Sequence, residues 1–207
     1  KIKKNNGKIH LIGLCSSGGV HSHQDHIFAA LKAIRDNGLE TSLHMILDGR
    51  DSPPKSALDS LKYFQKLSKN LNFISTISGR YYAMDRDQRW ERTELFLNGL
   101  IGQGEKIFDC PEEFILRQYR LGVTDEFVKP AISKAYKGIK KGKDGIIFMN
   151  FRADRIRQIA SALCDPQFNH FTIKRRPKFS ISASLVSYSN SLSKRILDFF
   201  PKVKPKN

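Results

Sequence analysis

The chain has 207 residues, of which 40% are apolar and 14 are phenylalanine, enough to bury a substantial core. It contains no run of about 18 apolar residues, which excludes a transmembrane helix, and we expect no membrane partner. Its three cysteines are too few for a disulfide scaffold and show no metal-ligand spacing. Together with a start that lacks a secretory signal, they favour a cytoplasmic protein.

The net charge of +16 is concentrated at the two ends of the chain. Residues 1–8 and 172–207 together supply +12, whereas residues 9–171 supply only +4. A nucleic-acid-binding domain usually spreads its basic residues over a recognition face, so nucleic acid is not the expected partner. We expect a basic linker at residues 1–7, one domain at 8–187, and a basic tail or linker at 188–207.

Four short apolar runs predict β-strands, each followed by a loop and then by a helical pattern of apolar residues. The predicted strands are residues 9–14, 42–47, 73–77 and 145–151. Apolar stripes over residues 27–34 and 58–67 predict two helices. Two further helices are predicted to cover residues 90–100 and 152–163. Helices at 112–121 and 130–139 and a weak strand within 178–187 complete the prediction. Strands that alternate with helices predict an α/β fold, a layered domain with a largely parallel sheet flanked by helices.

The loops that follow the four predicted strands carry similar polar residues. In chain order these are Gly18, Gly19, His21 and His23; Arg50 and Asp51; Arg80 and Arg86; and Arg152 and Arg155. Parallel strands end at one edge of a sheet, which is where such folds bind ligands. Five arginines at one edge would repel each other without an anion, and the guanidinium fork matches phosphate and carboxylate oxygens. The pattern therefore predicts a small substrate with more than one anionic group, on which Asp51 moves a hydroxyl proton.

Three other interpretations remain open from these residues alone. Cations at the start of the predicted helix 152–163 oppose the helix dipole, so Arg152 and Arg155 either bind an anion or pair with Asp154. His21, His23 and Asp25 are alternatively the ligands of a metal-dependent hydrolase. The chain as a whole is alternatively a non-catalytic anion- or nucleic-acid-binding basic module. The glycine-rich motifs of dinucleotide and P-loop sites and the nucleophile elbow are not in the sequence.

Taken together, the loops resemble those of the cofactor-independent (2,3-bisphosphoglycerate-independent) phosphoglycerate mutases. The matching segments are SGGVHSH at 17–23, LDGRDSPPKS at 47–56, SGRYYAMDRDQRW at 78–90, GVTDEFV at 122–128 and NFRADR at 150–155. They occur in the family's order over roughly residues 8–165. One position departs from the family, because Ser17 stands where an aspartate is usual.

The resemblance implies an isomerase of glycolysis that interconverts 3-phosphoglycerate and 2-phosphoglycerate. Such an enzyme has an alkaline-phosphatase-like domain, which carries two manganese ions and a transiently phosphorylated serine, and a phosphotransferase domain, which this chain resembles. The resemblance implies that the phosphoglycerate is held by His21, Arg50, Asp51, Arg80, Arg86, Arg152 and Arg155. Asp51 would be the catalytic residue, and no metal ligand is expected here. The partner is then the phosphatase-like domain, and this chain alone is expected to be inactive.

Overall fold

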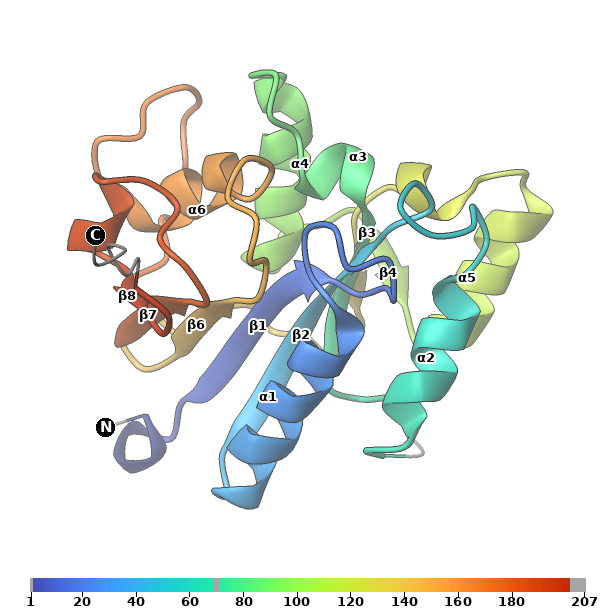
Figure 1. Cartoon of the computed structure of the whole chain (residues 1–207), viewed down its shortest axis with the longest axis horizontal. Coiled ribbons are helices and arrows are strands. Elements are labelled where there is room, and N and C mark those ends of the chain that lie inside the picture. Colours follow the sequence, from blue (N-terminus) through green and yellow to red (C-terminus); the bar gives the residue numbers. More distant parts are fainter. Residues whose placement is uncertain (1, 69–70, 202–207) are drawn as a thin grey trace, which may run out of the picture.

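The computed structural model describes residues 2–68 and 71–201, and within them the chain forms one eight-stranded sheet (Figure 1). The strand order is β4-β5-β3-β2-β1-β6-β7-β8, and every pair of neighbours is parallel except β3 and β5. The strands are β1 Lys8–Leu14, β2 Glu40–Leu47, β3 Ile74–Gly79, β4 Lys106–Phe108, β5 Ala131–Ser133, β6 Gly145–Phe148, β7 Ile181–Ser184 and β8 Leu197–Asp198.

Helices cover both faces of the sheet and divide the core in two (Figure 1). One face is covered by α1 Gln24–Asp36, α2 Ala57–Gln65 and α5 Pro111–Arg120, and the other by α3 Arg80–Ala83, α4 Trp90–Leu100 and α6 Arg157–Cys164. Short 3₁₀ turns are η1 Lys3–Asn5, η2 Asp125–Phe127 and η3 Leu192–Lys194. Successive side chains of β1 point to opposite faces of the sheet, so Leu11 packs with the first set of helices and Ile12 with the second. None of the described helices is both long and apolar enough to cross a bilayer.

The predicted fold class is confirmed, and the four predicted strands correspond to β1, β2, β3 and β6. The predicted helix at 130–139 is wrong. Residues 131–133 form β5 instead, because Ala131 and Ile132 pair with Ile77 and Thr76 of the adjacent strand. This long-range pairing overrides the local helical pattern.

The helix predicted to begin at Arg152 begins five positions later, at Arg157. The backbone amides of Phe151 and Arg152 donate hydrogen bonds to the carbonyl oxygen of His21, at 2.9 and 3.3 Å. These bonds hold residues 149–156 as a loop against the loop that follows β1. Arg152 and Arg155 therefore lie in this loop and not on the first turn of a helix, so the helix-dipole argument does not apply to them.

The division into linker, domain and tail stays a prediction, but residues beyond 187 contribute to the folded core. Tyr188, Leu192 and Ile196 are buried in the core beside α6. Strand β8 adds to the edge of the sheet, where Leu197 and Asp198 pair with β7. Residues 202–207 lie outside the described part of the chain.

A buried chain of polar side chains crosses the strands near the end of the sheet opposite the arginine loops. His10 lies 2.9 Å from His44 and 3.0 Å from Asp144, and His44 lies 2.9 Å from the Thr76 hydroxyl. The two imidazoles stack, and the Tyr136 ring packs edge-on against both. Burial lowers the pKa of His10, and it lowers that of His44 well below its usual value. Both histidines are therefore neutral in the folded protein.

These neutral histidines predict a loss of stability in mild acid. The unfolded chain gains protons at both histidines below about pH 6.5, whereas the folded chain, in which both pKa values are lower, gains fewer. The stabilisation that the neutral histidines provide is fully present above about pH 6.5 and decreases as the pH falls below that value. Between pH 7.5 and 5.5 we expect a loss of about 1–3 kcal/mol in the free energy of unfolding. Urea unfolding at the two pH values measures it, and His44→Gln should reduce the loss. A stability that is equal at both pH values for the unsubstituted chain would contradict this prediction.

Candidate functional site

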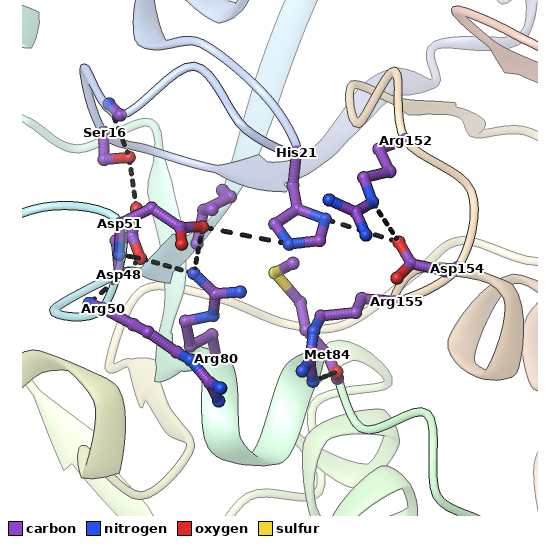
Figure 2. Close-up of polar contacts among 12 residues, drawn as sticks. Ser16, His21, Asp48, Arg50, Asp51, Arg80, Met84, Arg152, Asp154 and Arg155 are labelled. Carbon is purple, nitrogen blue, oxygen red and sulfur yellow. Dashed lines mark hydrogen bonds and ion pairs between the residues drawn. The ribbon is translucent and has the colours of Figure 1, made fainter.

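Four loops meet where neighbouring strands end, as the sequence predicted. Strands β3, β2, β1 and β6 are adjacent in the sheet, and the loops after them carry the seven candidate side chains. Figure 2 shows His21 at the centre, with Asp51 and Arg80 on one side and Arg152, Asp154 and Arg155 on the other. The strands are parallel, so their carboxyl ends bring residues more than a hundred positions apart to one edge.

Asp48 organises the loop after β2. Its carboxylate is buried and accepts hydrogen bonds from the Ser16 hydroxyl at 2.6 Å and from the Arg80 guanidinium at 2.7 Å. It also accepts from the backbone amides of Arg50 and Asp51. Burial alone would raise the pKa of Asp48, but these bonds outweigh burial and lower it. Asp48 therefore remains ionised and fixes the loop that presents Asp51.

Arg80 is a buried cation held between two carboxylates. Only 4% of the residue is exposed, and its guanidinium lies 2.7 Å from Asp48 and 2.5 Å from Asp51. Burial would lower the pKa of Arg80, but the two aspartates outweigh it and raise the pKa. Arg80 arises directly after β3, at the first residue of α3, so its position is fixed by the sheet. It orients Asp51 toward the centre of the site.

His21 lies between the carboxylates of two loops. Its Nε2 atom is 3.8 Å from Asp51, and its Nδ1 atom is 3.5 Å from Asp154. Burial lowers the pKa of His21, and the charges of Arg80 and Arg152 lower it further, whereas the two aspartates raise it. The imidazole is therefore neutral near pH 7. A neutral imidazole at this position is able to donate a hydrogen bond to an anionic ligand without adding charge.

A cavity of about 290 Å³ opens beside these residues, and arginines dominate its lining. Arg50, Arg80 and Arg155 line it, together with Arg89 and Arg92 from the segment after β3. Arg155 forms no ion pair within the described residues, and its guanidinium donates only to the Met84 carbonyl, at 3.4 Å. Burial and the neighbouring charges of Arg86, Arg80 and Arg50 lower its pKa. Arg155 thus has no carboxylate within ion-pair distance among the described residues, although the charge of nearby Asp154 partly offsets the lowering of its pKa.

Asp85, which the sequence analysis did not identify as a site residue, holds the loop that carries Arg86. Its buried carboxylate accepts hydrogen bonds from the amides of Asp87 and Arg89 and from the Gln158 side chain of α6. Gln158 in turn accepts from the Gln88 amide at 3.0 Å. The loop after β3 and the helix after the fourth loop are thereby joined. Arg89, Arg92 and Asp154 were also missed as site residues, although their neighbours within the same motifs were predicted.

The segment 122–128 supports the loop after β2 and also reaches the cavity, where Glu126 and Phe127 form part of the lining. Asp125 accepts hydrogen bonds from the amides of Ser56 and Ala57 and so caps α2 from a distant part of the chain. Gly79 allows this segment to pass β3, because a Cβ atom there would lie 2.2 Å from the Glu126 carbonyl oxygen. This close packing explains why the two motifs occur together.

The first loop packs against the second through Gly18. A Cβ atom at this position would lie 2.6 Å from the Asp51 carbonyl oxygen, so a side chain would separate the two loops. The neighbouring Ser17, at the position that departs from the family pattern, is exposed. It contributes no hydrogen bond to the contacts of Ser16 and Asp48.

The alternative metal site is not assembled. Among residues 2–68 and 71–201, no three histidine, cysteine, aspartate or glutamate side chains converge as metal ligands. His23 instead caps α1, where its Nδ1 atom accepts from the Asp25 amide at 3.2 Å. His21 faces Asp51 and Asp154. The residues proposed for a metal-dependent hydrolase therefore have separate roles.

Comparisons with known proteins agree with the geometry. Residues 1–190 match the family model described as the BPG-independent PGAM N-terminus. A 2,3-bisphosphoglycerate-independent phosphoglycerate mutase of Legionella pneumophila is 44% identical over 196 residues, which are 93% of this chain and 38% of that protein. One of Francisella tularensis subsp. novicida is 41% identical over 212 residues, covering 100% of this chain and 41% of that protein.

A solved structure shares the fold. It belongs to a set of crystal structures of Leishmania mexicana phosphoglycerate mutase at low cobalt concentration. It superposes with a TM-score of 0.80 and 28% sequence identity, over 94% of this chain and 38% of that one. The chain therefore spans about two fifths of the length of the proteins it matches.

Proposed function

We propose that this chain, which belongs to the family of BPG-independent phosphoglycerate mutase N-terminal domains, binds the phosphoglycerate of such an enzyme. The observation that carries the proposal is the convergence of four loops at one edge of the sheet. Arginines of three of these loops line a small cavity, with Asp51 against Arg80 and His21 near Asp51. The enzyme would be an isomerase of glycolysis that interconverts 3-phosphoglycerate and 2-phosphoglycerate in the cytoplasm. Residues 8–187 would be its phosphotransferase domain.

The side chains divide into groups that hold the substrate and a group that moves a proton. Arg50, Arg80, Arg86, Arg152 and Arg155 supply guanidiniums for the phosphate and carboxylate oxygens, and His21 donates a hydrogen bond to the phosphate. Asp51 exchanges the proton of the glycerate hydroxyl. When the phosphoryl group passes to an enzyme serine, the proton that the serine hydroxyl loses is relayed through Asp51 to the oxygen left on glycerate. After the glycerate turns, Asp51 removes the proton from the second hydroxyl, which takes the phosphoryl group back from the serine.

The serine and the metal ions would lie in an alkaline-phosphatase-like domain, the proposed partner of this one. Two manganese ions would there neutralise the charge that develops on the transferred phosphoryl group. The described residues of this chain provide no converging set of metal ligands, so we assign no metal ion to this domain. The chain by itself would bind substrate without turning it over.

Replacing Arg155 tests the binding role. Arg155 lines the cavity and forms no ion pair with the described residues, so Arg155→Ala should lower the affinity for 3-phosphoglycerate about 10- to 100-fold, as expected for one charge-assisted contact. Isothermal titration calorimetry of the 207-residue chain measures the change. The control is Arg157→Ala, because that exposed side chain donates to the Tyr188 carbonyl, outside the cavity. Equal loss in both variants, or no binding by the unsubstituted chain, would contradict the proposed function.

A further inference from the structure

Asp154 is the one carboxylate that contacts three of the proposed substrate-binding side chains among the described residues. Its Oδ2 atom accepts a hydrogen bond from Arg86 at 2.9 Å, and its Oδ1 atom lies 3.1 Å from Nε of Arg152. The same Oδ1 atom lies 3.5 Å from Nδ1 of His21. The two arginines come from loops after different strands, so Asp154 joins them across the site.

The contacts of Asp154 are incomplete on the side that faces His21. Asp154 Oδ1 and His21 Nδ1 are both buried, and neither has a hydrogen-bond partner within the described part of the chain. Buried polar atoms are rarely left unpaired, and exceptions often mark a site that changes with its ligand. The nearby arginines are about half exposed, so an anionic ligand is able to reach them.

The charges around Asp154 indicate that an anionic ligand would replace its carboxylate beside Arg86 and Arg152. Burial would raise the pKa of Asp154, but the hydrogen bond from Arg86 and the charge of Arg152 outweigh burial and lower it. The ionised carboxylate therefore pairs with both guanidiniums and offsets one of their two positive charges. A phosphate or carboxylate that binds them must compete with it.

We propose that Asp154 is a positioning residue, an internal counter-ion that holds Arg86 and Arg152 in the unliganded site and is displaced from them by the anionic substrate. Once displaced from the arginines, Asp154 still has His21 beside it. This inference rests on the proposed function, because it assumes that the two arginines hold the substrate.

Replacing Asp154 with asparagine is predicted to raise the affinity for 3-phosphoglycerate. Asparagine is similar in size but does not neutralise a guanidinium, so the variant should bind 3-phosphoglycerate about two- to tenfold more tightly, the range for one or two partly exposed ion pairs. A residue that merely supports the arginines would give weaker binding when replaced. Calorimetry on the 207-residue chain, with inorganic phosphate as a second probe, measures the change.

The matched control is Asp87→Asn, which removes the same charge next to the same arginine. Asp87 is exposed and lies 4.0 Å from Arg86 and 2.9 Å from Arg89, but it has no contact with His21. We expect less than a twofold change in its affinity. An equal gain in both variants would show a general charge effect and would overturn the role of Asp154.

A second readout is independent of ligand. His21 faces the charges of Arg80, Arg152, Asp51 and Asp154, and Asp154 raises its pKa. NMR titration of the imidazole should therefore show a lower His21 pKa in Asp154→Asn and an unchanged one in Asp87→Asn. An unchanged His21 pKa in Asp154→Asn, or weaker ligand binding by that variant, would overturn the inference. If the unsubstituted chain binds no 3-phosphoglycerate, it is the proposed function that fails.

Discussion

Asp51→Asn is expected to lower kcat by about two to four orders of magnitude while changing KM little, as for loss of a general acid–base group. Asparagine keeps the size of the side chain and its contact with Arg80, but it does not accept the hydroxyl proton. The assay needs a complete enzyme, for example the Legionella pneumophila relative with its matching segment replaced by this chain. Steady-state kinetics of the unsubstituted chimaera and the variant give the comparison.

A suitable control for this experiment is Asp59→Asn. Asp59 is an exposed aspartate of α2 whose ion pair, with Lys62, spans 4.0 Å, so its loss should leave kcat unchanged. Near-normal kcat in Asp51→Asn would show that another group or water moves the proton. Asp51 would then serve only to hold Arg80 and the loop.

Arg80→Ala is expected to destabilise the fold as well as the site. The variant leaves Asp48, which is 3% exposed, without its cation, although the Ser16 hydroxyl and two amides still donate to it. Breaking a buried ion pair in this way should lower the free energy of unfolding by about 3 kcal/mol. Urea unfolding at pH 7.5 measures this loss.

The comparison for Arg80 is Arg152→Ala, in which the arginine removed is 51% exposed. A partly exposed ion pair contributes little, so this variant should lose less than about 1 kcal/mol. If the two variants are equally stable, the network of Asp48 and Arg80 does not stabilise the fold. The roles of both residues would then be confined to the site.

The order of the main elements was predictable because strand and helix patterns are local. Apolar runs of five to seven residues identified β1, β2, β3 and β6, and amphipathic segments identified the helices α1, α2, α4 and α5. Short strands such as β4, β5 and β8 have two or three residues. They are too short for a periodic pattern, and they form through pairing with neighbours that the local sequence does not indicate.

The site was predictable to the extent that parallel topology gathers loops at one edge of the sheet. That rule placed Arg50, Arg80 and Arg155 around one cavity before any side-chain position was known. The rule does not predict which carboxylates face which arginines. The supporting roles of Asp48 and Asp85 depend on burial and on hydrogen bonds to backbone amides, which only the three-dimensional structure shows.

The central claim is that the cavity among the four loops binds a phosphorylated carboxylic acid, and a crystal structure of the chain with 3-phosphoglycerate tests it most directly. We predict the phosphate and carboxylate oxygens within hydrogen-bond distance of the guanidiniums of Arg155, Arg152 and Arg86. We also predict a glycerate hydroxyl next to the Asp51 carboxylate. A ligand bound instead on the basic residues near either end of the chain, with the cavity empty, would contradict the account.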